Sequence, residues 1–457
     1  MRIKTKSILA LLLCGFLAFS GCGKTSEDYS MEQGSQQKLE VDKSETIMEE
    51  QEKEAYIQPE MKGEITISCF YEQEFLTMAA EKFMEAYPDV TVTINVFNET
   101  SGVSSAEDYQ TYLNTKIMTG NAEDIIFNSF LPITKYAEMG VFEDLGRYLS
   151  LTPEMNDEHY FMNVLEAAKE ENGIIYLIPY MAKFDVVSFS EKLLSEQPSL
   201  AQNIQSASFS DRMMIANELI QNTNKRNAFL VQMNELSFAN YWIKDVFRDF
   251  VNIKDKTVNI KTEEYTNLLN MVKNLSESNA FGYDKIDFYN TEYYFATTCD
   301  YDVQAAFYEL DTSADVTLGM PIADEEGKVA INANGCLAMN SASENKDLAW
   351  EFIRYLLSDE VQSLPSLHGL AVNKAGFDAV VERYYKFYSE GNRSSVEKDE
   401  YAELLTNWMK QINDCDVVDS AIWNLIEEEN GKFFDGKQSA EETAAVLQRK
   451  LEQYFNE

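Results

Sequence analysis

Histidine is scarce in this chain, which has only His159 and His368 among its 457 residues. A zinc-protease motif of the HExxH kind is absent, and neither histidine can be assigned to a Ser-His-Asp set. The sequence also contains no P-loop and no GxGxxG motif. Because the sequence shows no catalytic motif of these kinds, we expect a chain that is not an enzyme and that needs no cofactor.

Basic residues are also few, with 38 lysines and arginines against 77 aspartates and glutamates, and the formal net charge is −39. A chain this acidic is repelled by the phosphates of nucleic acid and by an anionic membrane surface. Its charge therefore excludes both as partners bound through surface charge. Most of the acids are expected to lie on solvated faces.

Cysteine is sparse and widely spaced. The six cysteines are Cys14, Cys22, Cys69, Cys299, Cys336 and Cys415. No CxxC pair occurs among them, so a zinc site built from cysteines is not expected. In an exported chain the last four could be oxidised in pairs, but spacing alone does not say which, and free thiols fit equally well.

The N-terminus has the pattern of a secretory signal. A basic stretch with Arg2, Lys4 and Lys6 precedes an almost wholly apolar run over residues 8–19. A run of about a dozen residues is too short to span a bilayer comfortably. We therefore predict a signal peptide over residues 1–21.

The end of that run, Phe19-Ser20-Gly21-Cys22, resembles a bacterial lipobox, in which the cysteine is acylated and the chain is cut just before it. Phe19 departs from the pattern, because that position usually holds Leu. The resemblance implies that Cys22 carries palmitate and other acyl chains and anchors the protein to the extracytoplasmic face of a bacterial cell membrane. An ordinary secretory peptide with an incidental cysteine is the alternative.

Residues 22–62 contain this cysteine and a segment rich in Glu, Gln, Ser and Lys, with few large apolar residues. Such a composition cannot bury enough apolar surface to offset the entropy lost on ordering. We therefore predict a disordered acidic linker that holds a folded domain away from the membrane.

Residues 64–139 alternate between strand-like and helix-like patterns, which predicts an α/β fold with helices on a mostly parallel sheet. The expected strands cover 64–70, 90–96 and 124–127. The expected helices cover 74–87, a segment behind a Ser104/Glu107 capping box, and 132–139. Ligands in such sheets bind beyond the carboxyl ends of the strands, which here lie at 70–72 and 128–130.

The rest of the chain continues this mixture of elements. Extended runs are expected over 173–179, 185–189 and 316–321, and helices over 262–276, over 346–357 and behind a Ser439/Glu442 capping box. The roughly 395 residues after the linker are too many for one small core, so they suggest two lobes of ordinary domain size.

Several stretches together resemble the family 1 extracellular solute-binding proteins, the receptors of ABC importers and the group that includes maltose-binding protein. The resemblance covers roughly residues 63–455 and is carried by segments that occur in the family's order. These segments are Gly63–Ile67, Ala80–Ile94, Thr119–Ile126, Ala137–Leu145, Gly173–Pro179, Ser343–Ile353 and Phe434–Glu442.

The resemblance implies a two-lobed, type II periplasmic-binding-protein-like fold with a hinge and a ligand cleft between the lobes. Carried onto this chain, the crossovers lie near 178–182, 320–323 and 357–360. Lobe 1 then comprises 63–179 and 322–357, and lobe 2 comprises 180–321 and 358–457.

A sugar site needs aromatic faces for stacking, and carboxylates and amides for the hydroxyl groups. Candidate ligand contacts follow from strand ends and family positions. They are Tyr71, Glu72, Asn128, Ser129, Phe130, Tyr180, Lys183, Asp300, Tyr301 and Trp423. The alternatives are a surface turn for Tyr71 and Glu72, a hinge salt bridge for Lys183, and core packing in an amphipathic helix for Trp423.

The resemblance implies a monomeric receptor that captures a small solute, most readily a carbohydrate, and delivers it to ABC permease subunits. Two other classes stay open: a glycan-hydrolysing surface enzyme, and a surface adhesion or sensing module. The acid pair Asp300/Asp302 would suit the hydrolase. In so acidic a chain, however, adjacent acids arise by chance. No metal site is expected, because an EF-hand loop would need further spaced oxygens and a turn glycine.

Replacing Cys22 by alanine is expected to abolish lipid anchoring. Wild-type chain should take up a palmitate analogue and sediment with membranes, and Cys22→Ala should do neither. Cys14→Ala is the matched control, because Cys14 lies in the predicted signal and its loss should leave labelling intact. Labelled, membrane-bound Cys22→Ala would contradict the lipobox assignment.

Overall fold

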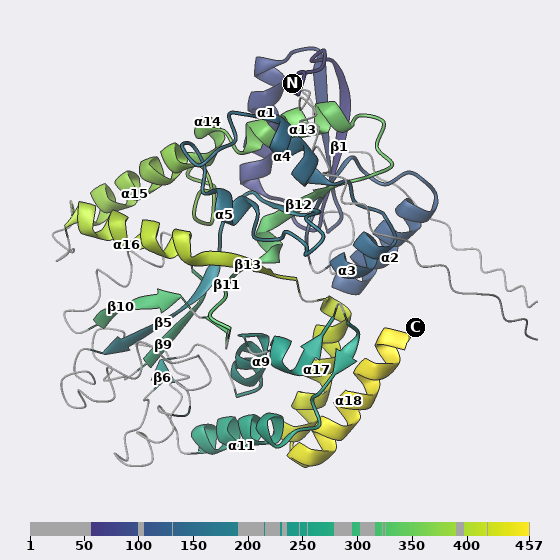
Figure 1. Ribbon diagram of the computed structural model, residues 1–457, viewed down its shortest axis with the longest axis vertical. Helices are drawn as coiled ribbons and strands as arrows, with labels where there is room; N and C mark the ends of the chain where they lie inside the picture. The colour runs from purple at the N-terminus through teal and green to yellow at the C-terminus, as the bar shows by residue number, and fades with distance from the viewer. Residues whose placement is uncertain are drawn as a thin grey trace, which may run out of the picture. The chain divides into compact units, whose positions relative to one another are not determined.

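The computed structural model (Figure 1) describes residues 56–98, 105–129, 131–190, 214, 229–230, 235–245, 247–253, 255–277, 295–301, 316–321, 323–324, 326–389, 397–417 and 419–456. The predicted signal peptide, Cys22 and most of the predicted linker lie outside these residues. Among the described helices, none has the length and apolar character that a membrane crossing requires.

The first sheet has five strands in the order β2-β1-β3-β12-β4. They span Gly63–Cys69 (β1), Val90–Val96 (β2), Ile125–Phe127 (β3), Cys336–Met339 (β12) and Ile178–Pro179 (β4). β1 pairs in parallel with β2 and β3, with Ile67 opposite both Ile94 and Ile125. Runs of β-branched and apolar side chains suit a sheet that is covered on both faces. The first three predicted strands are confirmed.

The helices in this half of the chain are α1 (Glu74–Ala86), α2 (Ala106–Met118), α3 (Ile133–Glu138), α4 (Leu145–Leu151), α5 (Met162–Leu165) and α13 (Lys346–Leu356). α1 and α13 pack on each other, and the ring centroids of Phe83 and Phe352 are 5.3 Å apart. Their apolar residues recur every three or four positions, which puts them on one buried helix face. The predicted helices over 74–87 and 346–357 are confirmed to within two residues.

Two predictions in this region need correction. The capping box of α2 is Ser105/Asp108, one residue later than the predicted Ser104/Glu107. The Ser105 side chain accepts from the Asp108 backbone N–H, and the Asp108 carboxylate accepts from the Ser105 backbone N–H. Aspartate can close such a box as glutamate does, which the expected S-x-x-E/Q pattern overlooks. In addition, the extended run over 173–179 is a strand only at Ile178–Pro179.

A second sheet has the order β10-β5-β9-β6. Its strands span Phe184–Ser190 (β5), Phe229–Leu230 (β6), Phe295–Tyr301 (β9) and Val316–Pro321 (β10). Two small sheets accompany it: β11 (Val329–Asn332) pairs in parallel with β13 (Ile412–Asp416), and β7 (Val251–Asn252) pairs with β8 (Thr257–Val258). The predicted strand over 316–321 is confirmed.

A separate helical core belongs to the last part of the chain and to a central segment. It comprises α9 (Glu235–Asp245), α10 (Phe247–Phe250), α11 (Glu263–Glu277), α17 (Ser420–Phe434) and α18 (Ala440–Asn456). The Tyr265 hydroxyl donates to Asn430 Oδ1 at 2.8 Å, and Asn430 Nδ2 donates to Asn240 Oδ1 at 2.9 Å. These hydrogen bonds link three helices. They also give the buried polar side chains partners, and a buried polar group without a partner costs stability. The Ser439/Glu442 capping box before α18 is confirmed.

Helices α14 (Asp359–Gln362), α15 (Lys374–Ser389) and α16 (Lys398–Gln411) join the first core. The fully buried Gln362 amide donates to the backbone oxygens of Tyr180 and Leu356 at 2.9 and 3.0 Å, and its Oε1 accepts from Val372 N at 2.9 Å. The division into lobes stays a prediction. These contacts nevertheless join 358–417 to the core of the first sheet, whereas the sequence-based division assigns that segment to lobe 2.

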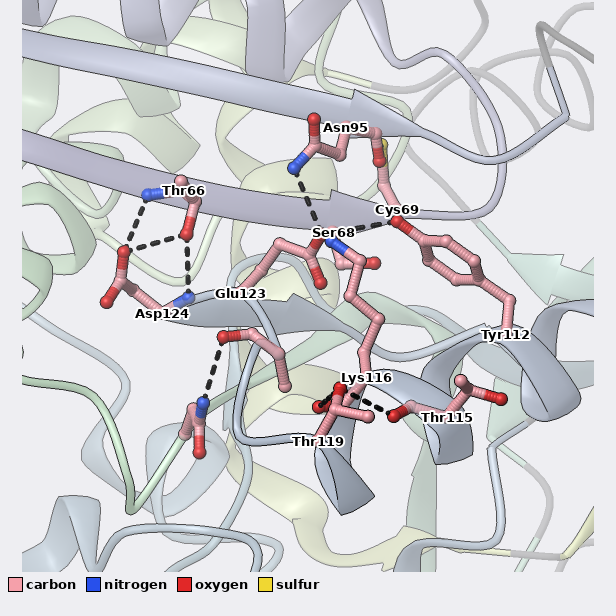
Figure 2. Close-up of polar contacts among 12 residues, drawn as sticks. Thr66, Ser68, Cys69, Asn95, Tyr112, Thr115, Lys116, Thr119, Glu123 and Asp124 are labelled. Carbon is pink, nitrogen blue, oxygen red and sulfur yellow. Dashed lines mark hydrogen bonds and ion pairs between the residues drawn. The ribbon is translucent and has the colours of Figure 1, made fainter. Parts of the chain in front are cut away.

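A buried carboxylate, Asp124, joins the middle of β1 to the start of β3. Its Oδ2 accepts from the Thr66 backbone N–H at 2.7 Å and from the Thr66 hydroxyl at 2.8 Å, and Figure 2 shows the two side chains facing each other. Its Oδ1 accepts from the Ser343 hydroxyl at 2.5 Å and from Asn345 Nδ2 at 3.4 Å, so the segment between β12 and α13 is held as well.

The neighbouring Glu123 is also buried. Its Oε1 accepts from Lys116 Nζ at 2.6 Å, from Asn95 Nδ2 at 3.0 Å and from the Tyr112 hydroxyl at 3.3 Å. Figure 2 shows this group between β2, α2 and the start of β3. A buried charge is tolerated only with a partner of opposite sign and with hydrogen bonds, and Lys116 supplies the charge here.

Replacing Asp124 by alanine is expected to lower the free energy of unfolding by about 2–4 kcal/mol, because the partly buried donors of Thr66 and Ser343 would lose their shared acceptor. Urea unfolding followed by far-UV circular dichroism measures the effect. Glu85→Ala, on the exposed face of α1, is the control and should change the free energy by less than about 0.5 kcal/mol. Equal effects of the two substitutions would refute the structural role of Asp124.

Candidate functional site

Strand direction brings the ends of several elements to one edge of the first sheet. β1, β2 and β3 are parallel, so their carboxyl ends meet there. β12 runs antiparallel to β3 and to β4, so the beginning of β12 and the end of β4 reach the same edge. We call this the carboxyl edge and define it by residues 70–73, 97–98, 128–129, 180–181 and 333–335. In α/β sheets, ligands bind at such an edge.

An aromatic cluster occupies the carboxyl edge beside β1 and β2. The Phe70 ring is buried, and its centroid lies 5.5 Å from that of Tyr109 and 6.1 Å from that of Phe97. The Tyr71 ring meets Phe70 edge to face at 4.3 Å but is 54% exposed. The buried rings therefore support one exposed aromatic side chain, which is the geometry that a stacking contact requires.

Glu72 follows Tyr71 and is also exposed, so the structure places these two predicted contacts next to each other at the edge. The next residue, Gln73, accepts a hydrogen bond from the Tyr180 hydroxyl at 3.1 Å. Residues 71–73, just beyond the end of β1, therefore supply an aromatic ring, a carboxylate and an amide in succession.

Asn128 is a buried residue that stabilises the structure of the carboxyl edge. It is 5% exposed, and its Nδ2 donates to the Ala333 backbone oxygen at 2.9 Å. Its Oδ1 accepts from Leu131 N at 3.3 Å, and its backbone N–H donates to the Cys336 oxygen at 3.0 Å. The side chain thus stabilises the turn after β3. It also supplies a hydrogen-bond donor to a backbone oxygen of the 3-10 turn Ala333–Gly335, which precedes β12. Ser129 beside it is partly exposed, and Phe130 lies outside the described residues.

Tyr180 is a core residue of the crossover after β4. It is 2% exposed, and its ring is stacked on Phe75 at 6.0 Å and tilted against Phe127 at 5.0 Å. Burial raises the pKa of its phenol well above the ordinary value, so the hydroxyl stays protonated and donates to Gln73. Lys183, three residues on, is partly exposed, and its backbone oxygen accepts from Asn332 N at 2.8 Å.

Asp300 and Tyr301 are the last residues of β9. Tyr301 is the pairing partner of Phe184, the first residue of β5, so the end of β9 comes next to the crossover that carries Lys183. The side chains of Asp300 and Tyr301, and all of Asp302, lie outside what the structure describes.

Trp423 lies on α17 and packs, partly buried, against the helical core. The first turns of α17 contact the first turns of α2: Gln110 Nε2 donates to the Ser420 hydroxyl, and Asn424 Nδ2 donates to Glu107 Oε1 at 3.0 Å. Residues 420 and 423 are three positions apart on this helix, so their side chains are neighbours on its surface. The structure therefore brings the Trp423 region next to the helix that follows β2.

One acceptor at the carboxyl edge lacks a hydrogen-bond partner within the described part of the chain. Asn98 comes directly after β2, and its backbone N–H donates to the Phe70 oxygen at 3.0 Å. Among the described residues, its buried Oδ1 accepts no hydrogen bond. A buried acceptor without a partner costs about 1–3 kcal/mol, which a ligand hydroxyl could recover.

Sequence reasoning did not single out Asn98, Gln110, Ser420 or Asn424 as site residues. The signal that could have found them is positional, because Asn98 follows a predicted strand and Gln110 lies in the first turns of the helix behind that strand. For Ser420 and Asn424 no local signal exists, since their contact partners are more than 300 residues away.

The arrangement supplies an exposed aromatic ring, an exposed carboxylate and an amide oxygen that accepts no hydrogen bond from the residues the structure describes. These groups can stack on the apolar face of a ligand and bond its hydroxyls. In the part of the chain that the structure describes, no group of three or more His, Cys, Asp or Glu side chains is close enough to hold a metal ion.

Comparisons with known proteins agree with this geometry. A family model described as "Bacterial extracellular solute-binding protein" matches residues 71–363, which is more than half of the chain. None of the curated proteins compared with the chain matches it.

Solved structures share the fold at low identity. A family 1 extracellular solute-binding protein from Alicyclobacillus acidocaldarius is 16% identical with a TM-score of 0.54, over 87% of this chain and 99% of that one. The sugar-binding protein MalE from Xanthomonas citri is 16% identical with a TM-score of 0.57, over 86% and 98%. An ABC substrate-binding protein from Listeria monocytogenes, in complex with cycloalternan, is 16% identical with a TM-score of 0.54, over 86% and 99%. The two-lobed type II fold expected from the sequence is thereby confirmed.

Replacement by alanine is expected to lower the free energy of unfolding at Asn128 and to leave it almost unchanged at Tyr71. Asn128→Ala should lower the free energy of unfolding by about 1–3 kcal/mol, because it removes the partners of buried backbone groups. Tyr71→Ala, at an exposed position, should change it by less than about 0.5 kcal/mol. Urea unfolding of the two variants side by side measures this. A stable Asn128→Ala chain would mean that the amide is available to a ligand after all.

Proposed function

We propose that this chain, which belongs to the bacterial extracellular solute-binding protein family, is the binding component of an ABC importer and captures a carbohydrate. The observation that carries the ligand class is the exposed Tyr71 ring, supported by buried Phe70 and flanked by Glu72. A sugar has apolar faces for such a ring and hydroxyl groups for a carboxylate, so the two side chains suit the two parts of its surface.

Asn98 supports the same ligand class. A sugar hydroxyl can donate to its buried Oδ1, which accepts no hydrogen bond among the described residues. Two of the structures with this fold are a sugar-binding protein and a complex with cycloalternan, which favours carbohydrate over peptide for this chain.

The mechanism that we propose is clamshell closure. Tyr71, Glu72 and Asn98 belong to the carboxyl edge of the first sheet, while Trp423 belongs to α17 and the helical core. A ligand that contacts both sides favours the state in which they are close, and so shifts the equilibrium of the hinge toward closure. The contacts of α2 with Ser420 and Asn424 supply a protein-only part of that closed interface.

The transport role adds a membrane anchor and a partner. Acylated Cys22 and the acidic linker would hold the binding domain, as a monomer, beside its permease, so that a high effective concentration replaces a stable complex. ATP hydrolysis would take place on other subunits. On this proposal the chain binds its sugar without cleaving it.

A thermal-shift screen of the chain against oligosaccharides, peptides and polyamines tests the proposal. A ligand at 100 times its dissociation constant should stabilise the fold by about 2.7 kcal/mol. We expect an oligosaccharide to raise the melting temperature and to be recovered intact. Tyr71→Ala should raise its dissociation constant about tenfold, which corresponds to a loss of about 1.4 kcal/mol.

Met118→Ala is the matched control for Tyr71→Ala. Met118 is also a large exposed apolar residue, but it lies at the far end of α2 from the carboxyl edge, so its loss should leave affinity unchanged. A melt shifted by peptides or polyamines and by no sugar would overturn the carbohydrate assignment. Release of smaller sugars by the purified chain, lost in Asp300→Asn, would instead favour the hydrolase.

A further inference from the structure

Two cysteines that are far apart in the sequence meet in the fold. The Sγ atoms of Cys336 and Cys415 are 4.0 Å apart, and both side chains are buried. Cys336 is the first residue of β12 in the first sheet, and Cys415 belongs to β13. The sequence alone leaves the pairing of the cysteines open, whereas this geometry selects one pair.

Backbone contacts fix the positions of both cysteines. Cys415 is the pairing partner of Ile331 on β11, and the short 3-10 turn Ala333–Gly335 leads from β11 to Cys336. The backbone oxygen of Cys336 accepts from Asn128 N at 3.0 Å, so the start of β12 is fixed to the carboxyl edge. A disulfide has an S–S length of about 2.05 Å, so the sulfurs need to approach by about 2 Å.

We propose that Cys336 and Cys415 form an intramolecular disulfide when the chain meets a disulfide-bearing oxidant, such as a thiol–disulfide oxidoreductase or a small-molecule disulfide. One cysteine thiolate attacks the oxidant's disulfide, breaks its S–S bond, forms a mixed disulfide with one sulfur and releases the other as a thiolate. The second cysteine thiolate then displaces the oxidant's remaining thiolate. In total the two cysteine thiols lose two protons and two electrons, and the oxidant's disulfide is reduced to two thiols.

Burial determines when this exchange takes place. Thiol–disulfide exchange needs access to both sulfurs, and folded β12 and β13 cover them. The bond therefore forms while β13 is undocked, either during folding or in a local opening. Once formed, it is protected from reductants by the same packing.

The bond would fix the segment just before α17 to the carboxyl edge. Cys415 precedes Ser420, the first residue of α17, by only five positions, and α17 carries Trp423. Linking Cys415 to the start of β12 closes a long loop between them, which restricts the unfolded chain and stabilises the fold. We expect the oxidised chain to melt at a higher temperature than the reduced chain.

The other thiols of the folded part are less suitable partners. The Cys69 thiol, on β1, donates to the Asn95 backbone oxygen at 3.9 Å. Cys299 lies within β9, and its side chain is outside the described part of the chain. A link from Cys299 to either member of the proposed pair is therefore the rival outcome of the test.

Peptide mapping of the full chain decides between these pairings. The chain is refolded with oxidised glutathione or with dithiothreitol, digested without reduction and analysed by mass spectrometry. We expect a peptide containing Cys336 linked to one containing Cys415 in the oxidised sample only. Labelling of the denatured chain with a maleimide should find two thiols fewer in the oxidised than in the reduced sample.

Single substitutions supply the matched controls. Cys336→Ser and Cys415→Ser should each abolish the link and the difference in melting temperature, whereas Cys69→Ser should keep both. Cys415→Ala serves if the serine variant does not fold, because it fills the site without a buried hydroxyl. An unchanged thiol count after refolding with oxidised glutathione, or a link between Cys299 and Cys336 or Cys415, would overturn the proposal.

Discussion

The buried carboxylate of Asp124 holds together three segments that are distant in the sequence: β1, β3 and the stretch after β12. Thr66 donates to one of its oxygens from both backbone and side chain, and Ser343 donates to the other. Parallel strands are not joined by tight turns, so their relative positions depend on contacts of this kind. The carboxyl edge exists as one surface because the strands that form it are held in this register.

The polar residues of the carboxyl edge have two roles: some are buried and fix its structure, and others are exposed at its surface. Asn128 and Tyr180 are buried and bonded to backbone or to Gln73, so they fix the shape of the edge. Tyr71 and Glu72 project from it and are exposed. A site that must hold a ligand in one geometry needs the first kind of residue as much as the second, because contacts on a mobile frame lose precision.

Two kinds of contact hold the parts of the chain together. Within the first core, the buried Gln362 amide donates to the Tyr180 backbone oxygen and so fixes the crossover. Between the two cores, the first turns of α2 and α17 are joined by hydrogen bonds from Gln110 to Ser420 and from Asn424 to the exposed Glu107. A two-lobed binding protein needs both kinds: a fixed crossover, and an outer contact that can be made and broken at low cost.

The sequence by itself determined the strands and helices of the first sheet, the family resemblance and the two-lobed fold, because these follow from local periodicity and from motifs within short stretches. It also predicted Tyr71 and Glu72 as neighbours at a strand end. Only the tertiary structure decided that Asn128 and Tyr180 are buried, that α2 meets α17, and that Cys336 faces Cys415. Those outcomes depend on contacts between residues tens to hundreds of positions apart in the sequence. A local pattern of side chains does not indicate which distant residues will come into contact.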